Sequence, residues 1–85
     1  GIYMKDKRED FETKDIYLAS ALIALGGFYS HADKSDPRHQ VFYFRDNGRV
    51  DFEKVVSEYV TGTLMINAAA FKESIQRMKS VIHSY

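Results

Sequence analysis

The stretch IYLASALIAL, residues 16–25, decides the fold because it is a helical segment with almost no polar side. Only Tyr17 and Ser20 are polar, and they do not form a wide polar stripe. A helix that is apolar all round must be covered on most sides. In a chain of 85 residues, we therefore expect this helix to lie between a sheet and another helix, or at a dimer interface.

Local signals mark both ends of this helix. Thr13 or Asp15 can accept an unpaired backbone N–H at its start, and Gly26–Gly27 predicts its end because glycine tolerates the left-handed conformation that follows a helix. Before the helix, Phe11–Thr13 alternates apolar and polar side chains, which is typical of a short strand.

Two runs after the helix, FYSHAD (28–33) and HQVFYFRD (39–46), predict an antiparallel hairpin with a long connection through Asp36–Pro37. Alternate side chains of the second strand share a face, Phe42 and Phe44 on one and Val41, Tyr43 and Arg45 on the other. Both faces carry aromatic rings, so we expect both to be partly covered.

Two amphipathic helices follow. Asp51 caps the first, and its apolar stripe at helical spacing comprises Phe52, Val55, Val56, Tyr59 and Val60. Asn67 caps the second, residues 68–83, with the stripe Phe71, Ile75, Met78 and Ile82. Between them, Thr61–Gly62 ends the first helix, and Leu64–Ile66 is an apolar link that can form an edge strand.

The predicted order is β-α-β-β-α-(β)-α, a small two-layer α+β domain over residues 11–85. Its antiparallel sheet, the hairpin plus one or two short strands, packs against three helices. If 64–66 also pairs, the first six elements follow the βαββαβ order of ferredoxin-like folds. Residues 5–10, KDKRED, are all charged, and we predict a solvated, mobile arm over residues 1–10.

The composition excludes several classes of function. Twelve basic residues balance twelve acidic ones, so no overall field attracts nucleic acid or an anionic membrane, and a charged binding face must be local. The chain has no cysteine, which removes disulfides and thiolate chemistry and fits the reducing cytoplasm. The longest apolar run, residues 16–25, is about half of a membrane span.

Three stretches of this sequence resemble a family of small bacterial and phage domains known as a domain of unknown function. They are FETKDIYLASAL (11–22), FYFRD (42–46) and YVTGTLMINAAAFKESIQRMK (59–79). The matching positions are packing and capping residues, so the resemblance implies a fold and no catalytic residues. The long HADKSDPRH connection departs from the shorter hairpin of that family.

The connection SHADKSDPRH, residues 30–39, raises the question of a metal site. Its imidazoles and carboxylates suit zinc or nickel, and the candidate ligands are His31, Asp33, Asp36 and His39. Asp, Ser and Pro are also turn residues, and the spacing matches no tight motif. We therefore interpret this loop as a hairpin tip and expect no cofactor.

The sequence contains no pattern typical of catalysis. No serine lies in a glycine elbow, and there is no P-loop or GxGxxG. The carboxylate pairs occupy solvated or capping positions. We therefore expect a protein without enzymatic activity.

Single-stranded nucleic acid is the ligand that the hairpin suits best. Binders of this class combine aromatic platforms with basic side chains. The hairpin offers Phe42 or Phe44 as further rings, and our candidate contacts are Tyr43, Arg45, Arg38, Arg49 and Tyr29. The alternative for the rings is a role in the core.

A protein-interaction module is the competing hypothesis. The helix over residues 16–25 is too apolar for a free surface, and a symmetric homodimer would bury it. The alternative is that the chain covers this helix by itself.

Overall fold

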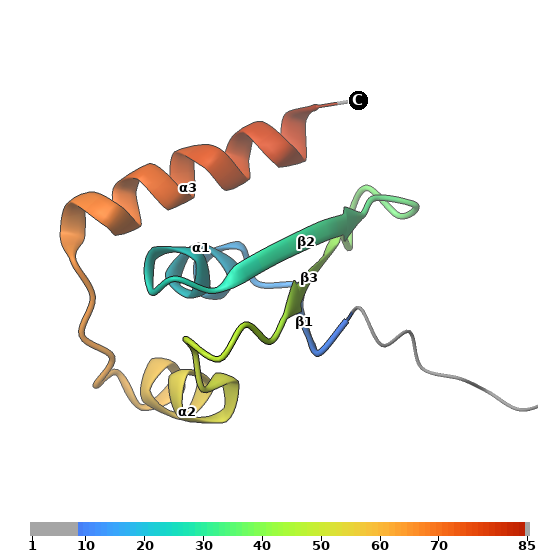
Figure 1. Ribbon diagram of the computed structural model, residues 1–85. Helices are drawn as coiled ribbons and strands as arrows, with labels where there is room; N and C mark the ends of the chain where they lie inside the picture. The colour runs from blue at the N-terminus through green and yellow to red at the C-terminus, as the bar shows by residue number, and fades with distance from the viewer. Residues whose placement is uncertain (1–8, 85) are drawn as a thin grey trace, which may run out of the picture.

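Strands and helices follow the predicted order over residues 9–84, which this computed structural model describes (Figure 1). Three antiparallel strands and three helices form an α+β domain with the order β-α-β-β-α-α. Of the predicted mobile arm, residues 1–8 lie outside the described residues. The elements are β1 (Phe11–Thr13), α1 (Ile16–Ala24), β2 (Phe28–Asp33), β3 (Val41–Arg45), α2 (Phe52–Thr61) and α3 (Ala68–His83).

β3 is the central strand of the sheet, whose order is β1-β3-β2. Phe44 of β3 lies opposite Phe11 of β1 and Tyr29 of β2. Its ring centroid is 6.5 Å from that of Phe11 and 5.7 Å from that of Tyr29. Phe42 and Phe44 are buried among residues of α1 and α3, so this inner face of the sheet belongs to the core.

Helix α1 is covered within the chain. Five consecutive residues of this helix, from Leu18 to Leu22, are buried, and α1 packs against α3 and touches β1 and β2. The hydroxyl of Ser20 donates to the carbonyl of Ile16 at 2.7 Å, so the buried polar group is satisfied. The expectation that this apolar helix lies between the sheet and another helix is confirmed.

The predicted capping residues begin and end the helices. The side chains of Asp15, Asp51 and Asn67 accept backbone N–H groups at the starts of α1, α2 and α3. Gly62 ends α2 with a φ of 78°, a left-handed conformation that a side chain would oppose.

The structure decides two points about α2 and its link to α3 that the sequence left open. Residues 64–66 form no strand, because the chain runs up the side of the domain from α2 to α3 instead of along the sheet (Figure 1). The described sheet therefore lacks the fourth strand of a ferredoxin-like fold. Val60 is 77% exposed, since α2 reaches the core through its other apolar residues: Phe52, Val55, Val56 and Tyr59.

Candidate nucleic-acid interface

A β-bulge shapes the outer face of the sheet, which lies opposite the core. The pairing shifts between Tyr29 and His31, so that Phe28 lies opposite Arg45 and His31 lies opposite Tyr43. In a regular strand, positions 28 and 31 would point to opposite faces. The extra residue of the bulge instead places both side chains on the outer face, beside Tyr43 and Arg45.

Three arginines from different segments surround the start of β2. The guanidinium carbon of Arg45 lies 5.5 Å from the ring centroid of Phe28, and that of Arg77 in α3 lies 5.9 Å from the ring centroid of Tyr29. The Cδ of Arg49 lies 3.7 Å from where a Cβ would stand on Gly26. We call Phe28, Arg45, Arg49 and Arg77 the basic edge.

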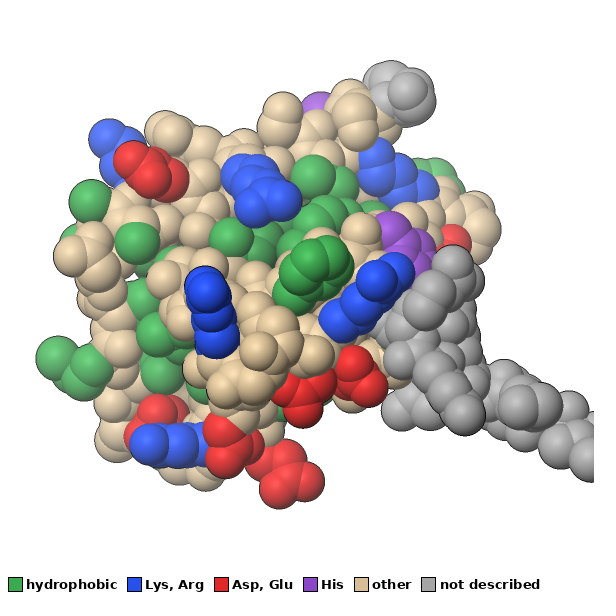
Figure 2. Space-filling model, in the orientation of Figure 1, with side chains coloured by type: hydrophobic (Ala, Val, Ile, Leu, Met, Phe, Trp, Pro, Cys, Tyr) green, Lys and Arg blue, Asp and Glu red, His purple; other side chains and the backbone are tan. Residues whose placement is uncertain are grey.

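Figure 2 shows this side of the molecule, where Lys and Arg side chains flank a hydrophobic patch over β2 and acidic side chains gather below it. Phe28 is 48% exposed, so a planar ligand can reach its ring. Arg49 and Arg77 form no ion pair with any acidic residue among residues 9–84. Their positive charges therefore remain available to an anion.

A tight turn after β3 positions Arg49. The carboxylate of Asp46 accepts the backbone N–H of Gly48 at 2.8 Å, and the side-chain oxygen of Asn47 accepts that of Arg49 at 3.1 Å. The amide nitrogen of Asn47 then donates to the carbonyl of Gly26 at 2.9 Å. This hydrogen bond holds the turn against the residues that lead into β2. Arg49 therefore lies near the start of β2, where Phe28 is also found.

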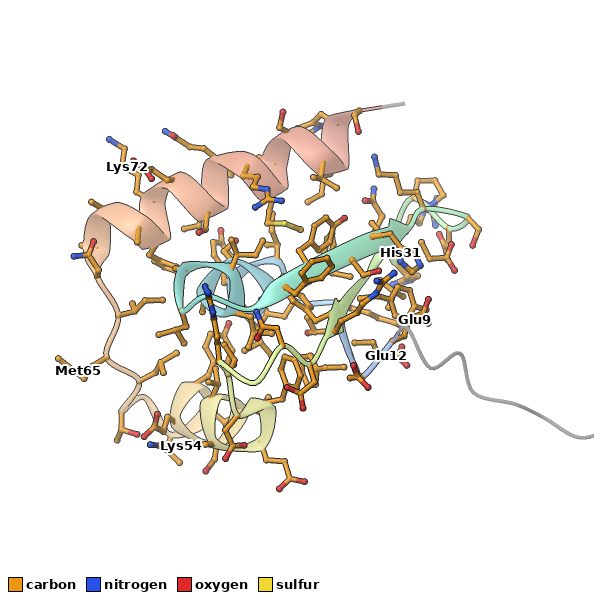
Figure 3. All side chains as sticks on the ribbon, viewed as in Figure 1. Glu9, Glu12, His31, Lys54, Met65 and Lys72 are labelled. Carbon is orange, nitrogen blue, oxygen red and sulfur yellow. The ribbon has the colours of Figure 1, made fainter. Side chains whose placement is uncertain are left out.

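The other half of the outer face is acidic. His31 stacks on Tyr43, with ring centroids 4.9 Å apart and an interplanar angle of 21°. Its Nε2 lies 3.0 Å from a carboxylate oxygen of Glu9, and Figure 3 shows the two side chains pointing toward each other. Glu12 lies opposite Tyr43, and hydrogen bonds from Ser35 lower the pKa of Asp33 at the end of β2.

The predicted contact residues divide among three places. Tyr43 and Arg45 share the outer face, and Arg49 joins Arg45 at the basic edge. Tyr29 lies on the inner face, where burial raises its pKa while Arg77 acts to lower it. Arg38 lies in the hairpin connection, ahead of the first residue of β3, whereas Arg45 is the last residue of that strand. The set is therefore not one surface.

The suggestion that Phe42 or Phe44 offers a platform is wrong. These residues are 2% and 0% exposed, because they fill the core below α1. The exposed ring of the hairpin is that of Phe28.

The four candidate metal ligands are not brought together. Among residues 9–84, no group of three or more His, Asp or Glu residues is placed to hold an ion. The carboxylates of Asp33 and Asp36 accept the backbone N–H groups of Ser35 and Arg38, so they shape the turn.

Lys34 has a structural partner. Its ammonium donates to the carbonyl oxygens of Val81 and Ser84 and to the Ser84 hydroxyl, at the C-terminal end of α3. A cation in this position complements the helix dipole and ties the end of β2 to α3.

Sequence reasoning missed Phe28 and Arg77. Phe28 was assigned no face, and only the bulge puts it outward; Ser30 beside Tyr29 carries no distinctive bulge signal. Arg77 is 48 positions from Tyr29 and lies on the polar side of the last helix, so no local pattern connects the two residues.

The fold and the site define a small α+β domain with an arginine-flanked edge strand. A family model described as "Domain of unknown function (DUF5659)" matches residues 8–84, so the chain belongs to this family. This confirms the resemblance seen in the sequence. Neither the curated proteins nor the solved structures contain a match. Within the described part of the chain, no helix has the length and apolar character needed to cross a membrane.

Proposed function

We propose that this chain is a small, non-enzymatic, cytoplasmic module that binds single-stranded nucleic acid along the basic edge. The observation that carries the proposal is an exposed aromatic ring, Phe28, with the guanidinium of Arg45 over it and the side chains of Arg49 and Arg77 beside the nearby residues Gly26 and Tyr29. Aromatic rings stack on bases of any sequence, and arginines contact the phosphates beside them. The two kinds of group therefore serve one ligand.

The negative charge on the outer face limits the path that a bound nucleic-acid strand can take. Glu9, Glu12 and Asp33 lie on its other half and would repel phosphates. Arg49 and Arg77 lie on opposite sides of the start of β2, close to Gly26 and to Tyr29. We therefore expect the backbone of the nucleic acid to follow the start of β2 and not to cross the sheet.

The proposed contacts predict a shallow salt dependence. Arg49 and Arg77, if they neutralise about two phosphates of a single strand, give a slope of about −1.4 in a plot of log K against log salt. This weak electrostatic term agrees with a chain whose total charge is zero. Base stacking on Phe28 must then supply much of the affinity.

The test is fluorescence anisotropy of a labelled strand of about 20 nucleotides, titrated at low and moderate salt. We expect Phe28→Ala to weaken binding by about 1–3 kcal/mol, since it removes one stacking platform. Arg77→Gln should make the plot of log K against log salt less steep, by the contribution of roughly one phosphate contact. Lys72→Gln is the matched control, because it removes one positive charge from an exposed position of the same helix, where Lys72 points away from the body (Figure 3).

Circular dichroism of each variant shows whether the fold is kept, which we expect for these exposed or partly exposed side chains. The proposal fails if the wild-type chain does not bind at low salt, or if Lys72→Gln weakens binding as much as Arg77→Gln. Equal losses would indicate attraction to any positive charge on α3 without a defined site.

A protein-binding module is the second candidate. Val60 and Met65 are 77% and 85% exposed, and both lie on the side of α2 and the link to α3. Large apolar side chains at such exposure are found at partner interfaces as well as singly on ordinary surfaces. Replacement of both with Gln would abolish partner binding here and leave nucleic-acid affinity unchanged.

A further inference from the structure

A hollow lies at the opposite end of the hairpin from the basic edge, where the connection between β2 and β3 meets the start of α1 and the end of α3. Its volume is about 260 Å³, and its lining includes the polar residues Lys14, Arg38, His39 and Gln40. Ile16 and Ile82 supply apolar surface. We call it the hairpin hollow, and it shares no residue with the basic edge.

The charge in the hairpin hollow is one-sided. Lys14 and Arg38 bring two positive charges, and no acidic residue among residues 9–84 lines the hollow. The nearest acids along the chain already accept hydrogen bonds. Asp15 accepts the N–H groups that start α1 and the hydroxyl of Tyr59, and Asp36 accepts the backbone N–H of Arg38. An anionic group would therefore meet two cations in a lining that, among the described residues, contains no carboxylate.

Gln40 provides the second observation. Its Oε1 is buried and has no hydrogen-bond partner within the described chain. Buried acceptors of this kind are rare in folded proteins. Gln40 lines the hairpin hollow, so a ligand that carries an N–H or O–H group would satisfy this oxygen once the side chain turns toward it.

We propose that the hairpin hollow binds a small organic acid. Its carboxylate or phosphate group pairs with Arg38 and Lys14, its apolar body lies on Ile16 and Ile82, and its hydroxyl or amino group donates to Gln40. The volume is below the roughly 300–1,000 Å³ of pockets for drug-sized ligands, which limits the ligand to about one ring. This site is independent of the proposed nucleic-acid function, because Arg38 lies away from the basic edge.

The test is a titration of the ¹⁵N-labelled chain, followed by amide chemical shifts, with three probes. 4-Hydroxybenzoate carries a carboxylate and a donor, 4-hydroxyphenyl phosphate replaces the carboxylate by phosphate, and 4-hydroxybenzamide has no charge. We expect the two anions to shift amides around 14–16 and 37–42 in a saturable way and the amide probe to leave them unmoved. The stronger of the two anions identifies the head group.

Two variants and a control separate the parts of the site. Arg38→Gln, at an exposed position, should raise the Kd of both anions about tenfold, the usual effect of losing a hydrogen bond to a charged group. Gln40→Met should weaken 4-hydroxybenzoate several-fold and leave benzoate, added as a fourth probe that lacks the donor, within about twofold. Lys54→Gln, at an exposed position on α2, should change nothing.

Three outcomes would overturn the proposal. The first is the absence of a saturable shift with either anion up to about 20 mM, a concentration that detects even very weak binding. The second is equal binding of the uncharged probe. The third is a set of shifts confined to residues 26–29, 45–49 and 77. The last outcome would place the anion on the basic edge, so it would leave the nucleic-acid proposal standing while the hairpin hollow is excluded.

Discussion

At the scale of single residues, one carboxylate joins two helices. One oxygen of Asp15 accepts the N–H groups of Tyr17 and Leu18 at the start of α1. The other accepts the hydroxyl of Tyr59 in α2 at 2.6 Å. This hydrogen bond is the main reason why the pKa of Tyr59 rises from 10.0 to about 12. The phenol can donate only while it keeps its proton.

Tyr59→Phe should therefore lower the free energy of unfolding by about 1 kcal/mol at neutral pH, as expected for one hydrogen bond. The folded pKa lies above the unfolded one, so the contribution is complete below pH 10 and is lost as the pH rises through about 12. Urea denaturation of both proteins between pH 7 and pH 12 measures the difference. A difference in unfolding free energy that stays constant from pH 7 to pH 12 would contradict the hydrogen bond between Tyr59 and Asp15.

The caps show what sequence can predict at this scale. Asp51 and Asn67 were identified, and Asp15 was one of two candidates with Thr13, because capping depends on groups two or three residues away. The bond between Asp15 and Tyr59 spans 44 positions, so it follows from the packing of α2 and could not be read locally.

At the scale of elements, α1 organises the core. Leu22 is 0% exposed and belongs to the core cluster with Phe42, Phe44 and Met78. Tyr17, on the same helix, is 51% exposed. The helix was predicted because its apolar character excludes a surface position, and the chain supplies the cover from within.

Leu22→Ala should lower the free energy of unfolding by about 2–5 kcal/mol, because it leaves a cavity among these rings and loses buried surface. Tyr17→Ala is the control in the same helix and should cost less than about 1 kcal/mol. Urea denaturation followed by circular dichroism measures both. Similar losses for the two variants would mean that α1 is not buried as described.

Strand pairing was harder to predict than helices. The periodic residues of β3 define its two faces from sequence alone, and the structure agrees at Phe42 and Phe44. Residues 64–66 have strand-like composition, but a strand needs a neighbour, and the position of α2 keeps this segment from the sheet. The β-bulge likewise depends on the partner strand, so the outward position of Phe28 could not be foreseen.

At the scale of the whole molecule, the candidate site is formed by segments that lie far apart in the sequence. Arg45 was a sequence candidate on β3, and Arg49 follows from the turn that reaches Gly26. Arg77 joins them only because α3 packs beside β2. Charge counts along the hairpin could suggest two of the three arginines, and the third required the fold.

The cover over α1 also bears on assembly. Since the sheet and α3 bury this helix, self-association gains little from it, and we expect a monomer of 9.8 kDa at micromolar concentration. Light scattering after size exclusion gives the mass directly. A dimer would favour the protein-binding candidate, and its dissociation by Val60→Gln with Met65→Gln would locate the interface.

The β-bulge in β2 has a further consequence for how the protein behaves in a crowded solution. β2 stands at the edge of the sheet, and a straight exposed edge invites the strand of another molecule to dock and begin a fibril. The irregularity between Tyr29 and His31 interrupts this edge halfway along, so an incoming strand finds no continuous ladder to extend. The same irregularity that turns Phe28 outward thus protects the chain against aggregation.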